Sequence, residues 1–121
     1  MEAREELLRQ LNKAFAKWDI KFLADNVSDN FRWVIVGERT ISGRKDFKNS
    51  LEQMKRGGPM MISVIDISTF QEKSLVEGTV EFMLEPGKKR KYSFCDVYVF
   101  SDSERNKVAE LRTYVTQMKK I

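Results

Sequence analysis

The chain has 121 residues, of which 41% are hydrophobic and 33% are charged, an ordinary composition for one globular domain that buries its own core. Its formal net charge is +4, and without a basic stripe that carries interleaved aromatics this small excess argues against nucleic-acid binding. There is no histidine and one cysteine, Cys95, so the commonest acid–base side chain near neutral pH is missing and no intrachain disulfide can form. We predict a single domain over residues 1–121.

Targeting and cofactor signals are absent from the sequence. No apolar run reaches the roughly 18 residues of a membrane-spanning helix, and the N-terminal segment is charged rather than signal-like. Without histidine and with one cysteine, the usual zinc ligand sets cannot be assembled. We therefore expect a cytoplasmic protein with no membrane association, no metal and no cofactor.

Helix-period patterns dominate the first half of the chain. Residues 2–17 predict an amphipathic helix, and Asp19 is typical of the N-cap of a short second helix. Residues 29–36 predict a strand with Phe31, Trp33 and Ile35 on one face. Residues 37–43 indicate a tight turn region that contains a short strand. A third helix over 44–55 is expected to begin at Ser42 or Gly43 and to stop at 57–59, Gly-Gly-Pro.

Strand patterns fill the second half. Four strands are predicted over 60–71, 74–84, 91–101 and 106–118, joined by turns at 71–73, 85–88 and 101–106, so consecutive strands should pair antiparallel. Gly78, in mid-strand, is expected to mark a bulge, although it would also leave room for a ligand.

Both faces of the predicted sheet carry apolar residues. Alternation places Phe94, Asp96 and Tyr98 on one face of the third long strand and Cys95, Val97 and Val99 on the other. One apolar face packs on the helices, so the other needs a second partner. We expect a homodimer through the outer sheet face, which includes Val97, Val99, Arg112 and Tyr114.

Five short motifs, in order along nearly the whole chain, resemble those of the nuclear transport factor 2-like superfamily, which includes SnoaL-like polyketide cyclases and steroid Δ5-isomerases. They are AFAKWD at 14–19, DNFRW at 29–33, ISGRKDF at 41–47, FCDVYVF at 94–100 and ELRTY at 110–114. The resemblance implies an α+β architecture. It is a cone-shaped, cystatin-like fold in which three N-terminal helices pack in a strongly curved, mainly antiparallel sheet.

The catalytic patterns of this superfamily are only partly present. Of the isomerase residues, the late-strand acid is kept at Asp96, whereas the tyrosine position falls on Leu11 and the base position on Ile35. The cyclases rely on cavity histidines that this chain lacks. Epoxide hydrolases of the same fold use an Asp–Arg–Asp relay, but alternation puts Arg112 on the opposite face from Leu111 and Thr113. Steroid isomerisation and that relay are therefore disfavoured.

The sequence nevertheless predicts an apolar, aromatic-lined pocket. Asp96 is the candidate catalytic acid; the alternatives are a structural carboxylate bonded to a tyrosine hydroxyl and a carboxylate at the solvated end of the strand. Tyr92 and Tyr98 could face the same cavity, as partners of Asp96, as ligand donors or as plain strand residues. The predicted ligand-binding residues are Phe15, Trp18, Trp33, Ile35, Phe47, Leu51, Phe82, Phe94, Tyr98, Leu111 and Thr113.

Two functions remain open from the sequence. The first is a domain that binds a small hydrophobic organic ligand, with acid–base chemistry of the isomerase, cyclase or dehydratase kind if a reaction occurs. The second is a non-enzymatic dimerisation or protein-interaction module. An open cone with Asp96 at its base favours the first function, and an interior filled by side chains favours the second.

Overall fold

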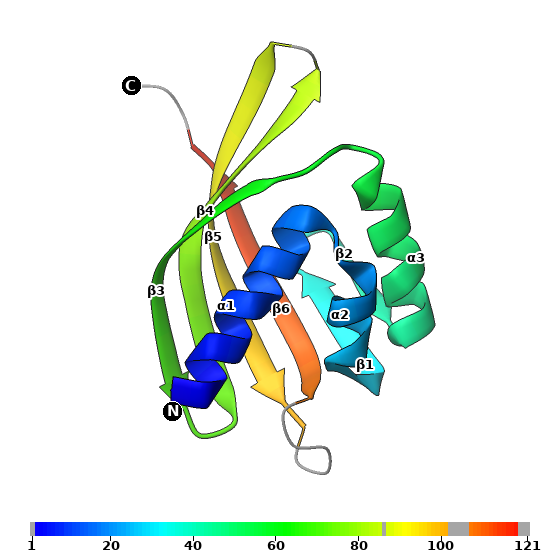
Figure 1. Cartoon of the computed structure of the whole chain (residues 1–121), viewed down its shortest axis with the longest axis vertical. Helices are drawn as coiled ribbons and strands as arrows, with labels where there is room; N and C mark the ends of the chain where they lie inside the picture. Colours follow the sequence, from blue (N-terminus) through cyan, green and yellow to red (C-terminus); the bar gives the residue numbers. More distant parts are fainter. Residues whose placement is uncertain (1, 86, 102–106, 119–121) are drawn as a thin grey trace.

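The computed structural model describes residues 2–85, 87–101 and 107–118 of the chain (Figure 1). In that part, three helices and six strands are arranged as an α+β fold. In chain order they are α1 (Glu2–Lys17), α2 (Ile20–Asp25), β1 (Val27–Ile35), β2 (Arg39–Ser42), α3 (Arg44–Lys55), β3 (Met61–Phe70), β4 (Lys73–Glu85), β5 (Lys88–Phe100) and β6 (Val108–Gln117).

The six strands form one curved sheet in the order β2-β1-β6-β5-β4-β3. All neighbours are antiparallel except β1 and β6, which run parallel. The sheet curls around α1, and α2 and α3 lie beside β1 and β2 (Figure 1). The predicted elements and the cone-shaped fold are confirmed. The expected turns at 85–88 and 101–106 include Pro86 and residues 102–106, which lie outside the described residues.

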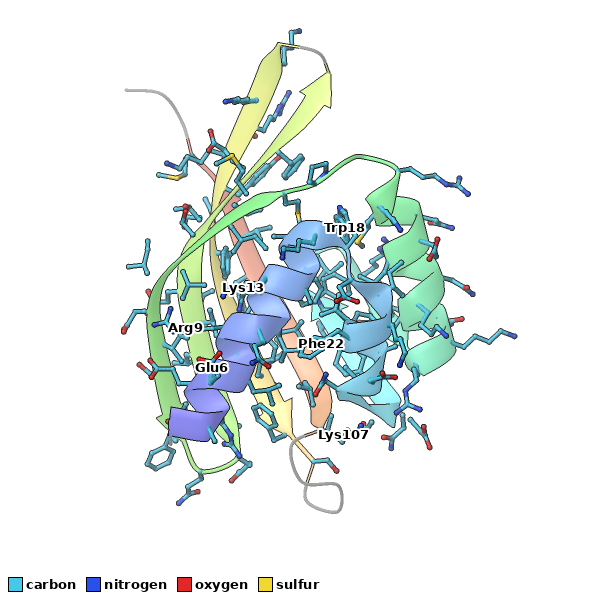
Figure 2. The ribbon with its side chains drawn as sticks, in the orientation of Figure 1. Glu6, Arg9, Lys13, Trp18, Phe22 and Lys107 are labelled. Carbon is cyan, nitrogen blue, oxygen red and sulfur yellow. The ribbon has the colours of Figure 1, made fainter. Side chains whose placement is uncertain are left out.

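Helix α1 is amphipathic, as its spacing predicts. Leu8, Leu11 and Phe15 are buried against the sheet, whereas the opposite face carries charged residues such as Arg9 and Lys13, which are exposed (Figure 2). Burying this stripe fixes which face of the helix meets the concave side of the sheet. The helix therefore supplies one wall of the interior.

The end of α1 is built in an unusual way. The amide of Asp19 donates to the carbonyl of Ala14 (2.8 Å) and that of Trp18 to the carbonyl of Phe15 (3.3 Å), which is the Schellman pattern. Trp18 occupies the left-handed position, with φ of 57°, where glycine is usual. Its indole N–H donates to the Gly58 carbonyl at 2.7 Å and so ties α1 to the connection before β3.

The other two helices begin as the sequence predicts. The Asp19 carboxylate accepts a hydrogen bond from the Phe22 amide (3.2 Å), which confirms its N-cap role for α2. Of the two candidates for the start of α3, the structure selects Gly43, at φ of 88°. Its amide donates to the Phe31 carbonyl, so the helix start is fixed against β1.

Gly78 lies opposite a bulge, as predicted. Val64 pairs with Gly78 and Asp66 pairs with Glu77, so Ile65 is the extra residue in β3. A Cβ at position 78 would meet the Ser63 carbonyl oxygen at 2.2 Å and the ring of Phe94 at 3.0 Å. Glycine is therefore required here by the close approach of β3 and by the aromatic ring packed across β4.

The core lies between the helices and the concave face of the sheet. Its centre is a group of interacting rings from three elements: Phe15 of α1, Phe31 and Trp33 of β1, and Phe47 of α3, with centroids 4.7–6.5 Å apart. Among the described residues, no helix is long and apolar enough to cross a membrane. Two rings of this group, Phe15 and Trp33, also line the cavity described below.

Candidate functional site

A cavity of about 380 Å³ lies between α1 and the concave face of the sheet. Its wall is mainly apolar, with aromatic rings from α1, β1, β4 and β5. Both tryptophans of the chain, Trp18 and Trp33, belong to this wall. A largely apolar concave site with a few polar groups is the usual form of a small-molecule site.

The hairpin of β4 and β5 extends beyond the neighbouring strands (Figure 1). Phe82 of β4 and Tyr92 of β5 line the cavity, and their rings stack with centroids 5.3 Å apart and planes 5° from parallel. Glu38, which is exposed in the turn between β1 and β2, also lines the cavity. The Glu38 amide donates to the Ile35 carbonyl at 2.9 Å and fixes that turn.

Asp96 is the acid in the wall of the cavity. It lies in β5 between Val76 of β4 and Thr113 of β6, and only 9% of its surface is exposed. Burial raises the pKa of its carboxyl group to about 7, although a hydrogen bond with the Thr113 side chain lowers it in part. Oδ1 of Asp96 is buried without a hydrogen-bond partner in the described part of the chain. The side chain can therefore exchange a proton near neutral pH.

Thr113 connects Asp96 to β1. Because β5 and β6 are paired at these positions, the two side chains share the concave face of the sheet. The Thr113 Oγ1 atom accepts a hydrogen bond of 2.8 Å from the indole N–H of Trp33. Trp33, Thr113 and Asp96 thus form a row across three neighbouring strands.

Two further hydroxyl groups lie on the same face below Asp96. Tyr98 and Ser74 are cross-strand neighbours and are almost fully buried, and both hydroxyls lack a hydrogen-bond partner among the described residues. Burial raises the pKa of Tyr98 well above its ordinary value, and the Asp96 charge raises it further. Tyr98 is therefore a neutral phenol throughout the pH range in which Asp96 titrates.

The cavity brings together most of the predicted site residues. Those in its wall are Phe15, Trp18, Trp33, Ile35, Phe82, Phe94, Asp96, Leu111 and Thr113. The others lie deeper in the core: Phe47 and Tyr98 border a second, very small void, and Leu51 is fully buried on α3. Whether any of these residues binds a ligand stays a prediction.

Several wall residues were not predicted as ligand-binding residues. They are Asn12, Glu38, Met54, Met60, Ile62, Val80, Tyr92 and Val115. Asn12 is the most informative omission, because it is 96% buried and its side-chain amide donates to the Leu8 carbonyl at 2.9 Å. Its spacing of four from Leu8 and three from Phe15 was a usable signal, since these distances put it on the buried face of α1.

The structure places Arg112 on the face of the sheet opposite Asp96. Arg112 hydrogen-bonds Glu110 at 2.5 Å and pairs with Val97, on the convex face and away from Asp96, so the two do not form the relay that the sequence also disfavoured. No group of three or more Cys, Asp or Glu side chains in the described residues is close enough to hold a metal ion.

Comparisons with known proteins give structural matches only. No family model matches the chain, and no curated protein matches it. An LEH-like epoxide hydrolase from M. tuberculosis superposes with a TM-score of 0.80 at 17% identity, covering 92% of this chain and 80% of the other. SalBIII, an epoxide hydrolase/cyclase-like enzyme of pyran ring formation in the polyether salinomycin, superposes with a TM-score of 0.82 at 16% identity. The match covers 95% of this chain and 92% of the other.

Proteins without a known activity superpose equally broadly. An NTF2-like protein of unknown function from Cytophaga hutchinsonii matches with a TM-score of 0.71 at 20% identity, covering 93% of this chain and 98% of the other. At such identities the likeness extends to the fold and not to the activity. The three helices, the curved six-stranded sheet and these superpositions agree that the chain has the nuclear transport factor 2-like fold.

Proposed function

We propose that residues 1–121 form one domain that binds a small, mostly hydrophobic organic molecule in the cavity beside Asp96. The observation that carries the proposal is a buried acid, Asp96, in the wall of an aromatic-lined cavity of about 380 Å³, where burial raises its pKa to about 7. Such an interior is costly to maintain without an occupant, because unfilled apolar space forgoes packing contacts. An interaction module has no need of it.

Acid–base chemistry is the reaction class that this site supports best. A carboxyl group with a pKa of about 7 is available in both protonation states at neutral pH, so it can give a proton to a ligand carbonyl or hydroxyl, or remove one. Isomerisation, cyclisation and dehydration are reactions of this kind. The likeness in fold to the epoxide hydrolase/cyclase-like SalBIII is compatible with such chemistry.

Ligand binding can be tested through the two tryptophans, because both line the cavity. A neutral aryl ketone such as acetonaphthone, titrated into the protein, is expected to quench their fluorescence saturably. Val80→Phe places a ring in the cavity and should weaken binding at least tenfold. Thr79→Phe, one residue away on the opposite face of β4, is the matched control and should leave binding unchanged. Equal affinities for the two variants would refute the proposed site.

Dimerisation through the convex face belongs to the same proposal. On that face Leu75, Val97, Val99, Cys95 and Tyr114 form adjoining rows across β4, β5 and β6. Leu75 and Tyr114 are exposed, at 41% and 46%. Contiguous apolar side chains of this kind favour a protein partner, and a second copy is the simplest one. We also place the protein in the cytoplasm as part of this proposal.

A further inference from the structure

The Trp33–Thr113 hydrogen bond has a chemical consequence for Asp96. An indole N–H can only donate a hydrogen bond, so in its contact with Trp33 the Thr113 hydroxyl oxygen is the acceptor. The 2.8 Å distance between Trp33 Nε1 and Thr113 Oγ1 shows that this bond is formed. A threonine hydroxyl carries one hydrogen, and with one lone pair occupied by Trp33 that hydrogen is free to point at another acceptor.

Asp96 supplies that acceptor. It is the cross-strand neighbour of Thr113 on β5, its Oδ1 atom is buried without a hydrogen-bond partner among the described residues, and the Thr113 side chain lowers its pKa, as a hydroxyl donor does. We propose that Trp33 and Thr113 are positioning residues for Asp96: the indole N–H orients the Thr113 hydroxyl so that it donates its hydrogen to the Asp96 carboxyl group. Any role of these residues in ligand chemistry rests on the proposed function above. The path of hydrogen bonds from Trp33 through Thr113 to Asp96, called the relay below, does not depend on that function.

The relay matters because, among the described residues, no cationic side chain lines the cavity to stabilise the Asp96 charge. The titratable side chains in the cavity wall besides Asp96 are Glu38, in the β1–β2 turn, and Tyr92, on β5. Tyr98, also on β5, lies below Asp96 on the same face, and Cys95 is adjacent on the other face. The residues that α1, α3, β3, β4 and β6 contribute to the wall are uncharged. No lysine or arginine of the described chain lines the cavity, so the Thr113 hydroxyl is the donor that favours the carboxylate.

As a consequence, both the protonated and the ionised form of the Asp96 carboxyl group are populated near neutral pH. Without the donor, burial alone would keep Asp96 protonated to a higher pH. With it, the acid can both give and take a proton near neutral pH, and its orientation is fixed by two neighbouring strands.

The test follows the carboxyl carbon of Asp96 by NMR of 13C-labelled protein, with the signal assigned by its absence in Asp96→Asn. Thr113→Val keeps the shape and removes the hydroxyl, so the Asp96 pKa should rise by at least about half a unit. Thr113→Ser retains a hydroxyl and should restore most of the wild-type value. Thr116→Val, an exposed position on the convex face of the same strand, is the matched control and should change nothing.

Trp33→Phe tests the first half of the relay. It should raise the Asp96 pKa in the wild-type background and have little further effect in the Thr113→Val background, because the influence of the indole N–H passes through Thr113. The proposal is overturned if Thr113→Val leaves the titration unchanged, or if Trp33→Phe gives the same shift in both backgrounds. If Thr113→Val does not fold, Thr113→Ala and Thr113→Ser give the same comparison. No ligand is needed, so failure of this inference and failure of the proposed function are distinguishable.

Discussion

At the scale of single residues, burial of the Asp96 carboxyl group lowers the free energy of unfolding as the pH rises. Its pKa in the folded protein is about 7, above the ordinary value of 3.8. Between these pH values the unfolded chain releases the proton before the folded protein does, so stability falls as pH rises. Three pKa units at about 1.4 kcal/mol each give a loss of about 4 kcal/mol on going from about pH 4 to about pH 7.

Asp96→Asn should remove this dependence. The amide has the same shape and stays uncharged, so the variant is expected to match the wild type below about pH 4, where Asp96 is protonated in both the folded and the unfolded chain, and to exceed its stability at pH 8. Urea midpoints at the two pH values measure the effect. A variant that is clearly less stable than the wild type at pH 8 would mean that the carboxylate has a structural role, and the pocket-acid interpretation would fail.

Trp18 is a second residue at which local and global preferences conflict. Its left-handed backbone costs about 1–2 kcal/mol for a residue with a side chain, but the residue is 92% buried and its indole N–H donates to the Gly58 carbonyl. Glycine is the usual residue at a left-handed helix end, and the burial and hydrogen bond of Trp18 show why tryptophan is tolerated here. Its ring covers one side of the cavity.

Trp18→Gly should therefore destabilise the protein despite relieving the backbone. Removing a large buried ring costs about 3–5 kcal/mol, so the net loss is expected to be about 2–3 kcal/mol. Trp18→Phe is the control, because it keeps the backbone and most of the buried area and loses only the bond to Gly58. Thermal unfolding of the three proteins would decide the matter, and a more stable glycine variant would show that the strain dominates.

At the scale of elements, most of the structure could be predicted from alternation and helix periodicity. Period-2 alternation put Asp96 and Thr113 on the concave face and Arg112 on the convex face, and the register agrees. Alternation does not report how far along the cone a residue lies. Phe47, Leu51 and Tyr98 were therefore assigned to the pocket although they are part of the closed core, and the parallel pairing of β1 with β6 was not foreseen.

Hydrophobic periodicity also does not identify polar residues that lie on apolar faces. Asn12 lies within the buried stripe of α1, but a search for apolar periodicity omits it. Glu38 and Met60 reach the cavity from connections between elements, whose paths no periodicity describes. The relay from Trp33 to Asp96 depends on the strand order β1-β6-β5, which sequence neighbours do not reveal.

The bulge opposite Gly78 gives a prediction at this scale. Gly78→Ala would place a methyl group 2.2 Å from the Ser63 carbonyl oxygen, a backbone atom held in β3, so the strands must separate locally. We expect a loss of about 1–3 kcal/mol, typical of overpacking. Gly57→Ala, whose Cβ would lie 3.3 Å from the Met54 carbonyl oxygen, is the milder comparison. Equal urea midpoints for the two variants would contradict the close approach.

At the scale of the whole molecule, the two faces of the sheet carry different surroundings and side chains. The concave face holds the helices and the cavity, whereas the convex face combines apolar side chains with a small charged group, in which Arg32 and Arg112 both approach Glu110. A two-fold dimer that covered the apolar rows would leave the mouth of the cone open. Binding and dimerisation are therefore compatible in one molecule.

The dimer makes the last prediction. Val97 is central to the convex apolar rows, between Leu75 of β4 and Arg112 of β6. Val97→Lys would place a second positive charge beside Arg112, and the two-fold symmetry would repeat both charges on the partner copy, so the two chains should repel each other. Sedimentation equilibrium at tens of micromolar is expected to give twice the chain mass of 14.2 kDa for the wild type and a single chain mass for this variant. Lys13→Glu, on the exposed face of α1, should leave the dimer intact (Figure 2). A monomeric wild type, or a variant that stays dimeric, would show that the convex face is not the interface.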